Sequence, residues 1–129
     1  MAAVIYLDTH VVVWLYGLGV AAVPEPVLRA IDAADELRIS PMVRLELQYL
    51  YEIERVAQPA LEVLDGMQAT LGLAQCDAPF AAVVQAAQAQ RWTRDPFDRL
   101  IVAQASLYDA PLITKDEQIH IHYPHACWE

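Results

Sequence analysis

The sequence predicts an α/β fold with a mostly parallel central sheet. Short apolar runs without polar alternation, which are typical of strands covered on both faces, alternate along the chain with longer segments that carry apolar residues at helical spacing. The first and the last of these runs are each followed by an acidic residue. Because strands joined through helices pair in parallel, we expect both acids at one edge of the sheet.

The first half of the chain contains two predicted strands. Residues 2–7 form the first, which ends at Asp8. The next segment is rich in β-branched residues, but a capping aspartate or threonine at its start and Gly17 at its end favour a helix. The other elements of this half are a helix over residues 24–34, a brief strand over 37–39, and a helix from Pro41 to about Arg55, capped by Ser40.

The second half predicts mostly helices. Residues 71–74 form a candidate short strand that contains a glycine, and residues 110–114 form a strand that ends in an acidic turn at Asp116. The predicted helices cover residues 59–70, 79–90 and 96–107.

The composition fits one globular domain over residues 1–129. The chain is 57% apolar and has no linker-like or repetitive segment. Its longest uncharged apolar run, residues 11–23, is shorter than the ~20 residues of a membrane span, and residues 2–7 lack the basic flank of a secretory signal. We therefore expect a cytoplasmic protein that is not inserted in a membrane, with Cys76 and Cys127 as ordinary thiols.

Residues 93–104, T-R-D-P-F-D-R-L-I-V-A-Q, carry the most informative motif. Asp95 fits the N-cap of a helix, Pro96 its first position, and Asp98 its third, from which a side chain can turn back toward the free amides. Capping alone would account for both acids. However, the helix that follows is almost entirely apolar, so two acids at its entrance also need water or a cation beside them.

Glu46 lies on the apolar stripe of its predicted helix. Its neighbours at helical spacing are Met42 one turn before it and Leu50 one turn after it. An ionised carboxylate buried without a partner costs several kcal/mol, so this acid should be paired, protonated or bound to a cation. A salt bridge to Arg44 or Arg94 is the alternative to a functional site.

Four acids are therefore expected along one rim of the sheet, because ligands of open α/β folds bind beyond the carboxyl ends of the strands. Like charges held close together repel each other unless a hard cation shares them, and oxygen ligands suit Mg²⁺ or Mn²⁺. Thr9 and Thr114 are candidates for orienting a ligand or a water molecule through their hydroxyl groups, or for simply capping turns. The four acids are Asp8, Glu46, Asp98 and Asp116.

Four sequence blocks resemble a PIN-domain ribonuclease of the VapC toxin type. They are L-D-T-H at residues 7–10, S-P with L-E-L at 40–47, W-T-R-D-P-F-D-R-L-I-V-A-Q-A at 92–105, and L-I-T-K-D at 112–116. The resemblance implies a three-layer α/β/α sandwich and a Mg²⁺- or Mn²⁺-dependent endoribonuclease. It also implies a cognate VapB-like antitoxin whose tail occupies the active site.

The resemblance also assigns individual residues. It identifies Asp8, Glu46, Asp98 and Asp116 as the catalytic and metal-binding acids, and Asp95 as the extra acid that caps its helix or contacts the metal. The candidates for contacts with RNA phosphates, or for solvated or salt-bridged surface positions, are Arg94, Arg99 and Lys115. The low number of basic residues, 8 lysines and arginines in all, argues against a broad RNA-binding surface.

Other readings of the sequence remain open. A haloacid-dehalogenase-like phosphatase would need a second aspartate where this chain has His10, and a catalytically silent interaction module or a DNase is compatible with the same acids. The surplus of apolar helix surface suggests a homodimer, with the region of Trp14 and the two middle helices as candidate contacts. A transition-metal site is a weaker alternative for the histidines of the tail, His120, His122 and His125.

Overall fold

The computed structural model describes residues 3–129, and in this part of the chain five strands form one sheet in which all neighbours are parallel. The order across the sheet is β3-β2-β1-β4-β5. The sheet prediction is confirmed, and pairing is parallel throughout rather than mostly. The strands are β1 (Val4–Leu7), β2 (Glu36–Ile39), β3 (Ala74–Gln75), β4 (Leu112–Ile113) and β5 (Ala126–Cys127).

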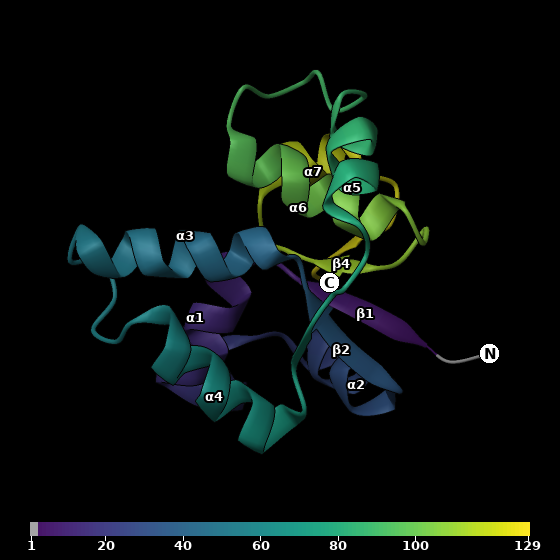
Figure 1. Cartoon of the computed structure of the whole chain (residues 1–129). Helices are drawn as coiled ribbons and strands as arrows, with labels where there is room; N and C mark the ends of the chain where they lie inside the picture. The colour runs from purple at the N-terminus through teal and green to yellow at the C-terminus, as the bar shows by residue number, and fades with distance from the viewer. Residues whose placement is uncertain (1–2) are drawn as a thin grey trace.

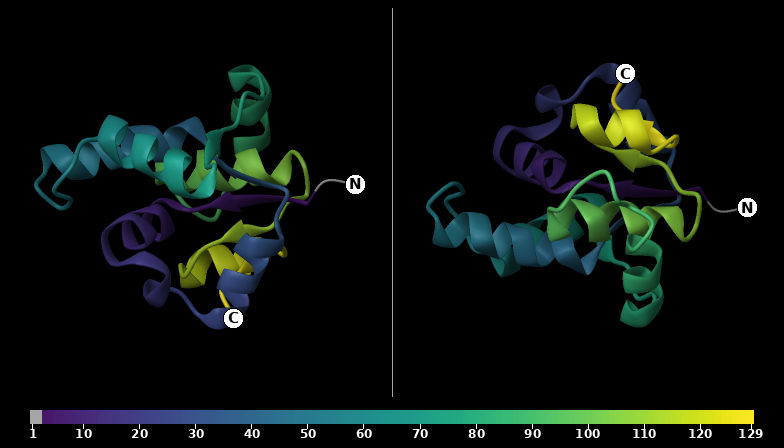
Figure 2. Two further views of the ribbon diagram at one scale, coloured as in Figure 1. Left: turned by 90° about the horizontal axis from the view of Figure 1, so that it is seen from below. Right: turned by 90° about the horizontal axis from the view of Figure 1, so that it is seen from above.

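Helices cover both faces of the sheet, so the fold is the expected three-layer α/β/α sandwich (Figures 1 and 2). One face carries α1 (Thr9–Leu18), the short 3-10 helix η1 (Gly19–Ala22), α2 (Glu25–Ala33) and α7 (Glu117–His122). The other face carries α3 (Pro41–Glu52), α4 (Ala60–Leu71), α5 (Phe80–Ala87) and α6 (Pro96–Ser106).

The core lies on both sides of β1, the central strand. Tyr6 and Leu7 are 1% and 0% exposed, which explains why the strand is apolar without alternation. Fully buried valines and isoleucines of α1, α3 and α6 pack against it, and each such side chain contributes about 1.5–3 kcal/mol to folding. Because the two faces are closed in this way, polar side chains at the strand ends are held against a rigid layer.

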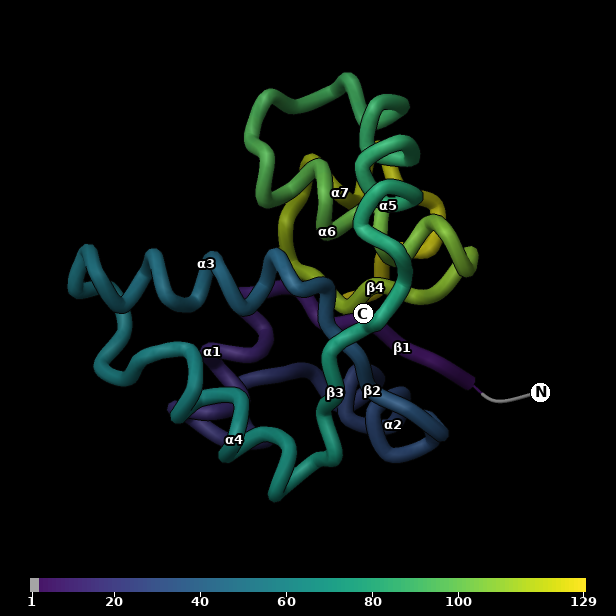
Figure 3. The backbone as a smooth tube through the Cα atoms, viewed as in Figure 1, coloured from purple at the N-terminus to yellow at the C-terminus, as the bar shows by residue number. Residues whose placement is uncertain are grey.

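Local capping explains most helix boundaries. Ser40 accepts a hydrogen bond from the amide of Met42 (3.1 Å), and Pro41 occupies the first position of α3, as predicted. Gly72 ends α4 in the left-handed region, with φ of 69°. The prediction of a strand over residues 71–74 is wrong for this reason, since Leu71 is still helical and β3 begins at Ala74, where the chain runs beside β2 (Figure 3).

The tail differs most from the sequence prediction. Residues 117–122 form the helix α7 and residues 126–127 form β5, and the sequence predicted neither element. The cap of α7 is Asp116, and a strand of only two residues has no readable periodicity. Ala2 of the first predicted strand lies outside the described residues.

None of the helices within residues 3–129 is by itself long and apolar enough to cross a membrane. The one helix pair that has the length and composition, residues 9–22 with 25–33, is bent by 110°.

Candidate functional site

The candidate site lies where the order of the strands reverses. From β1 the chain first builds β2 and β3 on one side and then returns to place β4 on the other side of β1. The carboxyl ends of β1 and β4 are therefore neighbours, with Leu7 beside Ile113. Open α/β sheets bind ligands at such a crossover point, and here it brings Asp8 next to Thr114.

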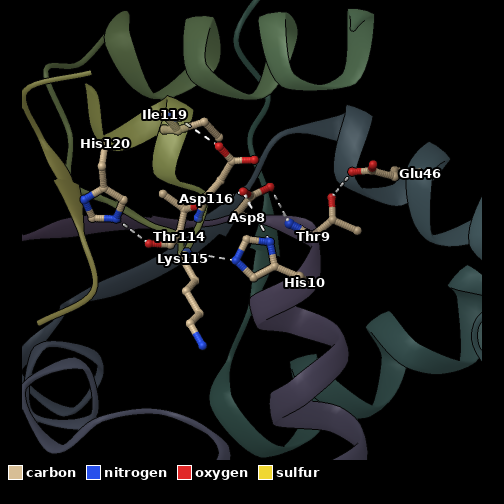
Figure 4. A network of polar contacts seen from close by, with 9 residues as sticks. All are labelled: Asp8, Thr9, His10, Glu46, Thr114, Lys115, Asp116, Ile119 and His120. Carbon is tan, nitrogen blue, oxygen red and sulfur yellow. Dashed lines mark hydrogen bonds and ion pairs between the residues drawn. The ribbon is translucent and has the colours of Figure 1, made fainter. Parts of the chain in front are cut away.

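Asp8 is held rigidly at this position. One carboxylate oxygen accepts the amide of Thr9 (2.7 Å) and so caps α1, while the other accepts the hydroxyl of Thr114 (2.7 Å) (Figure 4). The imidazole of His10 approaches that second oxygen at 3.5 Å through Nδ1, and its Nε2 accepts the amide of Lys115 (2.9 Å). Asp8 is only 4% exposed, so these bonds compensate for most of its lost hydration.

Thr114 links Asp8 to the next acid along the sheet. Its hydroxyl accepts the amide of Asp116 (3.1 Å) while it donates to Asp8, and its side chain is fully buried. Asp116 in turn caps α7 through a bond from the amide of Ile119 (3.0 Å). Thr114 therefore makes the local turn considered from the sequence and also fixes Asp8, whereas the hydroxyl of Thr9 donates to Glu46 rather than capping a turn.

The motif at the start of α6 places Asp95 and Asp98 differently. Asp95 caps the helix through the amide of Phe97 (2.8 Å), and its own amide donates to the hydroxyl of Thr93 (3.1 Å). The sequence allowed the side chain of Asp98 to turn back and accept a free amide at the start of the helix. In the structure the hydroxyl of Thr93 accepts the amide of Asp95 instead. Asp98 has no hydrogen-bond partner among residues 3–129, and its carboxylate lines the cleft described below.

Glu46 joins the site from α3. It accepts a hydrogen bond from the hydroxyl of Thr9, across the gap between α3 and α1 (Figure 4). The alternative of a salt bridge to Arg44 or Arg94 is not found in the described part of the chain, where Glu46 has no ion pair. A partly buried glutamate on an apolar stripe is therefore explained by its position at the cleft.

These side chains line one cleft of about 440 Å³. The structure thus brings together all four acids predicted from the sequence, from β1, α3, α6 and the end of β4, together with Asp95. The cleft is completed by two apolar residues of α1 and α3 and by the loop after α3. Its lining residues are Asp8, Thr9, His10, Val13, Glu46, Leu50, Arg55, Val56, Asp95, Asp98 and Asp116.

The electrostatics of the cleft show strong repulsion between the acids. Burial, together with the charges of Asp95 and the other cleft acids, raises the pKa of Asp98 from 3.8 to about 7. Burial also raises the pKa of Glu46; the nearby charges of Asp8 and Asp95 act in the same direction, and the hydrogen bond from Thr9 opposes them. A cation in the cleft would relieve this repulsion.

The donor set is chemically suited to a hard divalent cation, because it consists of carboxylate oxygens. Among residues 3–129, however, no three acidic, histidine or cysteine side chains stand close enough together to hold an ion as they are placed. Asp98 has no hydrogen-bond partner among residues 3–129. Its oxygens can therefore turn to a ligand without breaking a hydrogen bond.

The predicted basic residues have partners outside the cleft. Arg94 donates to the carbonyl of Arg91 (3.0 Å), and Arg99 donates to the carbonyl of Ala87 (3.2 Å) at the end of α5. The ammonium of Lys115 lies 5.9 Å from the centre of the Trp14 ring, and its side chain extends away from Asp116 in Figure 4. Sequence reasoning instead missed His10 and Arg55, which line the cleft.

The tail histidines point to separate partners. His120 bonds through Nε2 to the carbonyl of Thr114 (2.6 Å), and His122 stacks on Trp92 at 5.1 Å between ring centres. His125 contacts Tyr123 edge-on. In the described part of the chain these three histidines belong to no group of side chains that could hold a metal ion.

Comparisons with known proteins agree with this geometry. The family model for the PIN domain matches residues 5–123. Ribonuclease VapC22 of Mycobacterium tuberculosis (strain ATCC 25618 / H37Rv) is 34% identical, with 92% of this chain and 91% of that protein covered.

Two solved complexes share the fold. The crystal structure of VapBC2 from Rickettsia felis bound to a DNA fragment from their promoter has a TM-score of 0.65 at 18% identity and covers 98% of this chain and 97% of the other. The crystal structure of DNA-bound VapBC from Salmonella typhimurium has a TM-score of 0.65 at 20% identity, with 100% and 98% covered.

Proposed function

The chain belongs to the PIN domain family, and on that basis we propose that it is a VapC-type toxin, an endoribonuclease that hydrolyses RNA phosphodiester bonds. The observation that carries the proposal is the convergence of Asp8, Glu46, Asp98 and Asp116 on one cleft at the point where the strand order reverses. The similarity to a ribonuclease over nine tenths of the chain supports the same reaction class.

We further propose that the cleft uses Mg²⁺ or Mn²⁺, held by Asp98 with Asp8, Asp116 and Glu46. Such an ion supplies Lewis acidity that activates the attacking water and stabilises negative charge on the phosphate. The raised pKa of Asp98 supports this assignment, because an acid that loses its proton with difficulty in the free protein gains most from a cation.

The chain's own residues prepare this site. The hydroxyl of Thr114 fixes one oxygen of Asp8, and the hydroxyl of Thr9 orients Glu46 toward the cleft. Asp98 must give up its proton before it can bind a cation, so we expect cleavage to need a higher concentration of Mg²⁺ or Mn²⁺ as the pH drops below about 7. The five acids that line the cleft, Asp98 included, repel a phosphate unless a cation is bound. Cleavage therefore depends on neutralising their charge.

Cleavage of a labelled single-stranded RNA tests the function directly. We expect cleavage with Mg²⁺ or Mn²⁺, none with EDTA, and none by Asp8→Asn or Asp98→Asn, whereas Asp65→Asn on the exposed surface of α4 should cut normally. A DNA oligonucleotide of the same sequence separates the RNase from the DNase reading. If the folded protein cuts neither the RNA nor the DNA, with Mg²⁺ or with Mn²⁺, the result favours the catalytically silent interaction module.

A VapB-like antitoxin is the proposed partner, supported by the fold shared with the VapBC complexes. Its tail would need cationic side chains to enter a cleft lined by five acids. We expect RNA cleavage to stop when the chain is bound to a cognate VapB-like antitoxin, and activity that persists in a purified complex would refute the assignment.

The proposed homodimer has candidate contacts both in the region of Trp14 and on the two middle helices. Trp14 itself packs edge-on against Trp128 in the same chain at 5.7 Å, but Leu18 and Val20 near it are 71% and 60% exposed. On the middle helices, Leu61 of α4 and Phe80 of α5 are 57% and 66% exposed. Light scattering of the purified protein tests whether its mass is that of a dimer.

The two free cysteines and the RNA substrate fit the proposed action in the cytoplasm.

A further inference from the structure

The proposed cleft has a shortage of positive charge. Five carboxylates line it, and an RNA strand brings further negative charge with each phosphate. A divalent cation neutralises the acids and the phosphate being cut, but the neighbouring phosphates still need lysine or arginine side chains. The three basic residues singled out in the sequence do not line the cleft and have partners elsewhere.

Arg55 supplies the missing charge. Among the described residues that line the cleft it is the only lysine or arginine. It is exposed, and its guanidinium makes no ion pair or hydrogen bond with any of residues 3–129, although several acids line the same cleft. A cation at an acidic cleft that is not neutralised by the protein itself remains available to a ligand.

The backbone of Arg55 is fixed by the way α3 ends. The amide of Arg55 donates to the carbonyl of Leu50 (2.8 Å) and the amide of Glu54 donates to the carbonyl of Tyr51 (3.0 Å), which is the Schellman pattern. Glu54 holds the left-handed position of this motif with φ of 62°, where glycine is usual. The turn thus directs the chain back toward the cleft at Arg55.

A second hollow continues the cleft past Arg55. It has a volume of about 700 Å³ on the loop after α3, and it shares Arg55 and Val56 with the carboxylate cleft. Its other lining residues include Glu52 and Glu54, which would repel phosphates further out. The favourable position for a phosphate is therefore the junction of the two hollows.

We propose that Arg55 binds a phosphate of the RNA strand as the strand leaves the carboxylate cleft. The proposal rests on the proposed function for the identity of the ligand, and it replaces Arg94, Arg99 and Lys115 as the phosphate contact. Guanidinium groups bind phosphate with paired hydrogen bonds, so the contact fixes the position of the strand as well as attracting it.

Binding of a fluorescent 12-nucleotide single-stranded RNA to the Asp98→Asn protein, followed by anisotropy over a range of salt concentrations, tests the proposal without cleavage. In this background we expect Arg55→Ala to weaken binding about 10-fold and to reduce the slope of log Kd against log salt by about 0.7, the value for one phosphate contact on a single strand. Arg55→Lys should keep most of the slope, since it keeps the charge.

Two controls separate a lost phosphate contact from a disturbed loop. Arg55→Gln removes the charge but keeps an unbranched polar side chain that still donates hydrogen bonds, so it should lose the slope as Arg55→Ala does. Arg29→Ala removes an exposed arginine of α2, which pairs with Glu25 on the opposite face of the sheet, and should change neither affinity nor slope.

Equal salt slopes for Arg55→Gln and Arg29→Ala would overturn the proposal, as would the absence of RNA binding by the Asp98→Asn protein. The outcomes also distinguish this proposal from the function. Wild-type protein that cuts RNA without dependence on Arg55 refutes the contact alone. Wild-type protein that binds RNA through Arg55 but does not cut it with Mg²⁺ or Mn²⁺ refutes the nuclease alone.

Discussion

Replacing Asp98 by asparagine should stabilise the metal-free protein at neutral and alkaline pH. Asp98 is partly buried among four other acids, and it has no hydrogen-bond partner among residues 3–129 that an amide would lose. Asparagine has nearly the same shape and carries no charge. The substitution therefore removes mainly the repulsion and the penalty of burying a charge.

The size of the effect follows from the raised pKa. Between the ordinary value of 3.8 and the folded value of about 7, the folded protein holds a proton on Asp98 that the unfolded chain has released. Stability of the wild type should therefore fall as the pH rises through this window and level off above it. A shift of about 3 units corresponds to at most about 4 kcal/mol, and water and salt in the open cleft reduce the expected loss to about 1–3 kcal/mol.

Urea unfolding in EDTA at pH 5 and pH 8 measures this difference. The wild type should be less stable at pH 8 than Asp98→Asn, while at pH 4 the two should be nearly equal, because the carboxyl is then protonated. Asp65→Asn, at an exposed position of α4, should follow the wild type. The reasoning is refuted if Asp98→Asn destabilises the metal-free protein at pH 8 or keeps the full loss of stability between pH 5 and pH 8.

Three further predictions concern the neighbours of Asp98. Thr114→Val should lower the free energy of unfolding by about 1–3 kcal/mol and slow RNA cleavage, because Asp8 loses the hydroxyl that donates to it. Thr114→Ser keeps that hydroxyl, so it should restore stability in urea unfolding and activity in cleavage assays. Asp116→Ala should destabilise the protein by about 1 kcal/mol through loss of the α7 cap, whereas Asp116→Asn keeps the cap. Equal stabilities of the two variants would contradict the capping role. Neither variant should cleave RNA. Mn²⁺ should raise the melting temperature more at pH 8 than at pH 5.5, reversibly with EDTA, and a pH-independent rise would argue against Asp98 as a ligand.

The sequence predicted the fold well wherever local patterns were strong. The continuous apolar run before Asp8, the Ser-Pro start of α3 and the Asp-Pro start of α6 each combine burial with a capping residue, and all three elements are found. The failures lie in the short elements β3, α7 and β5. β3 begins three residues after the predicted start, and α7 and β5 were not predicted. The bounds of β3 and β5 depend on the free backbone groups that the neighbouring strands offer, which local sequence does not reveal.

The site was predicted less evenly, for a physical reason. The four acids could be placed on one rim because each follows a strand or lies on a helix of readable orientation. His10 and Arg55 could not be placed at the site from the sequence. The ring of His10 is held by the amide of Lys115, which is distant in the sequence, and the position of Arg55 depends on an irregular turn with Glu54 in the left-handed region. Such positions are set by tertiary contacts, so propensity alone gives no signal for them.

The helix caps offset part of the repulsion between the five acids of the cleft. Asp8, Asp95 and Asp116 cap α1, α6 and α7, so three helices begin at the cleft, and the partial positive charge at each N-terminus favours a carboxylate there. Glu46 and Asp98 cap no helix, and burial together with the charges of neighbouring carboxylates raises the pKa of each. The division indicates that the capping acids build the site, while Asp98 and Glu46 carry the repulsion that a bound cation would relieve.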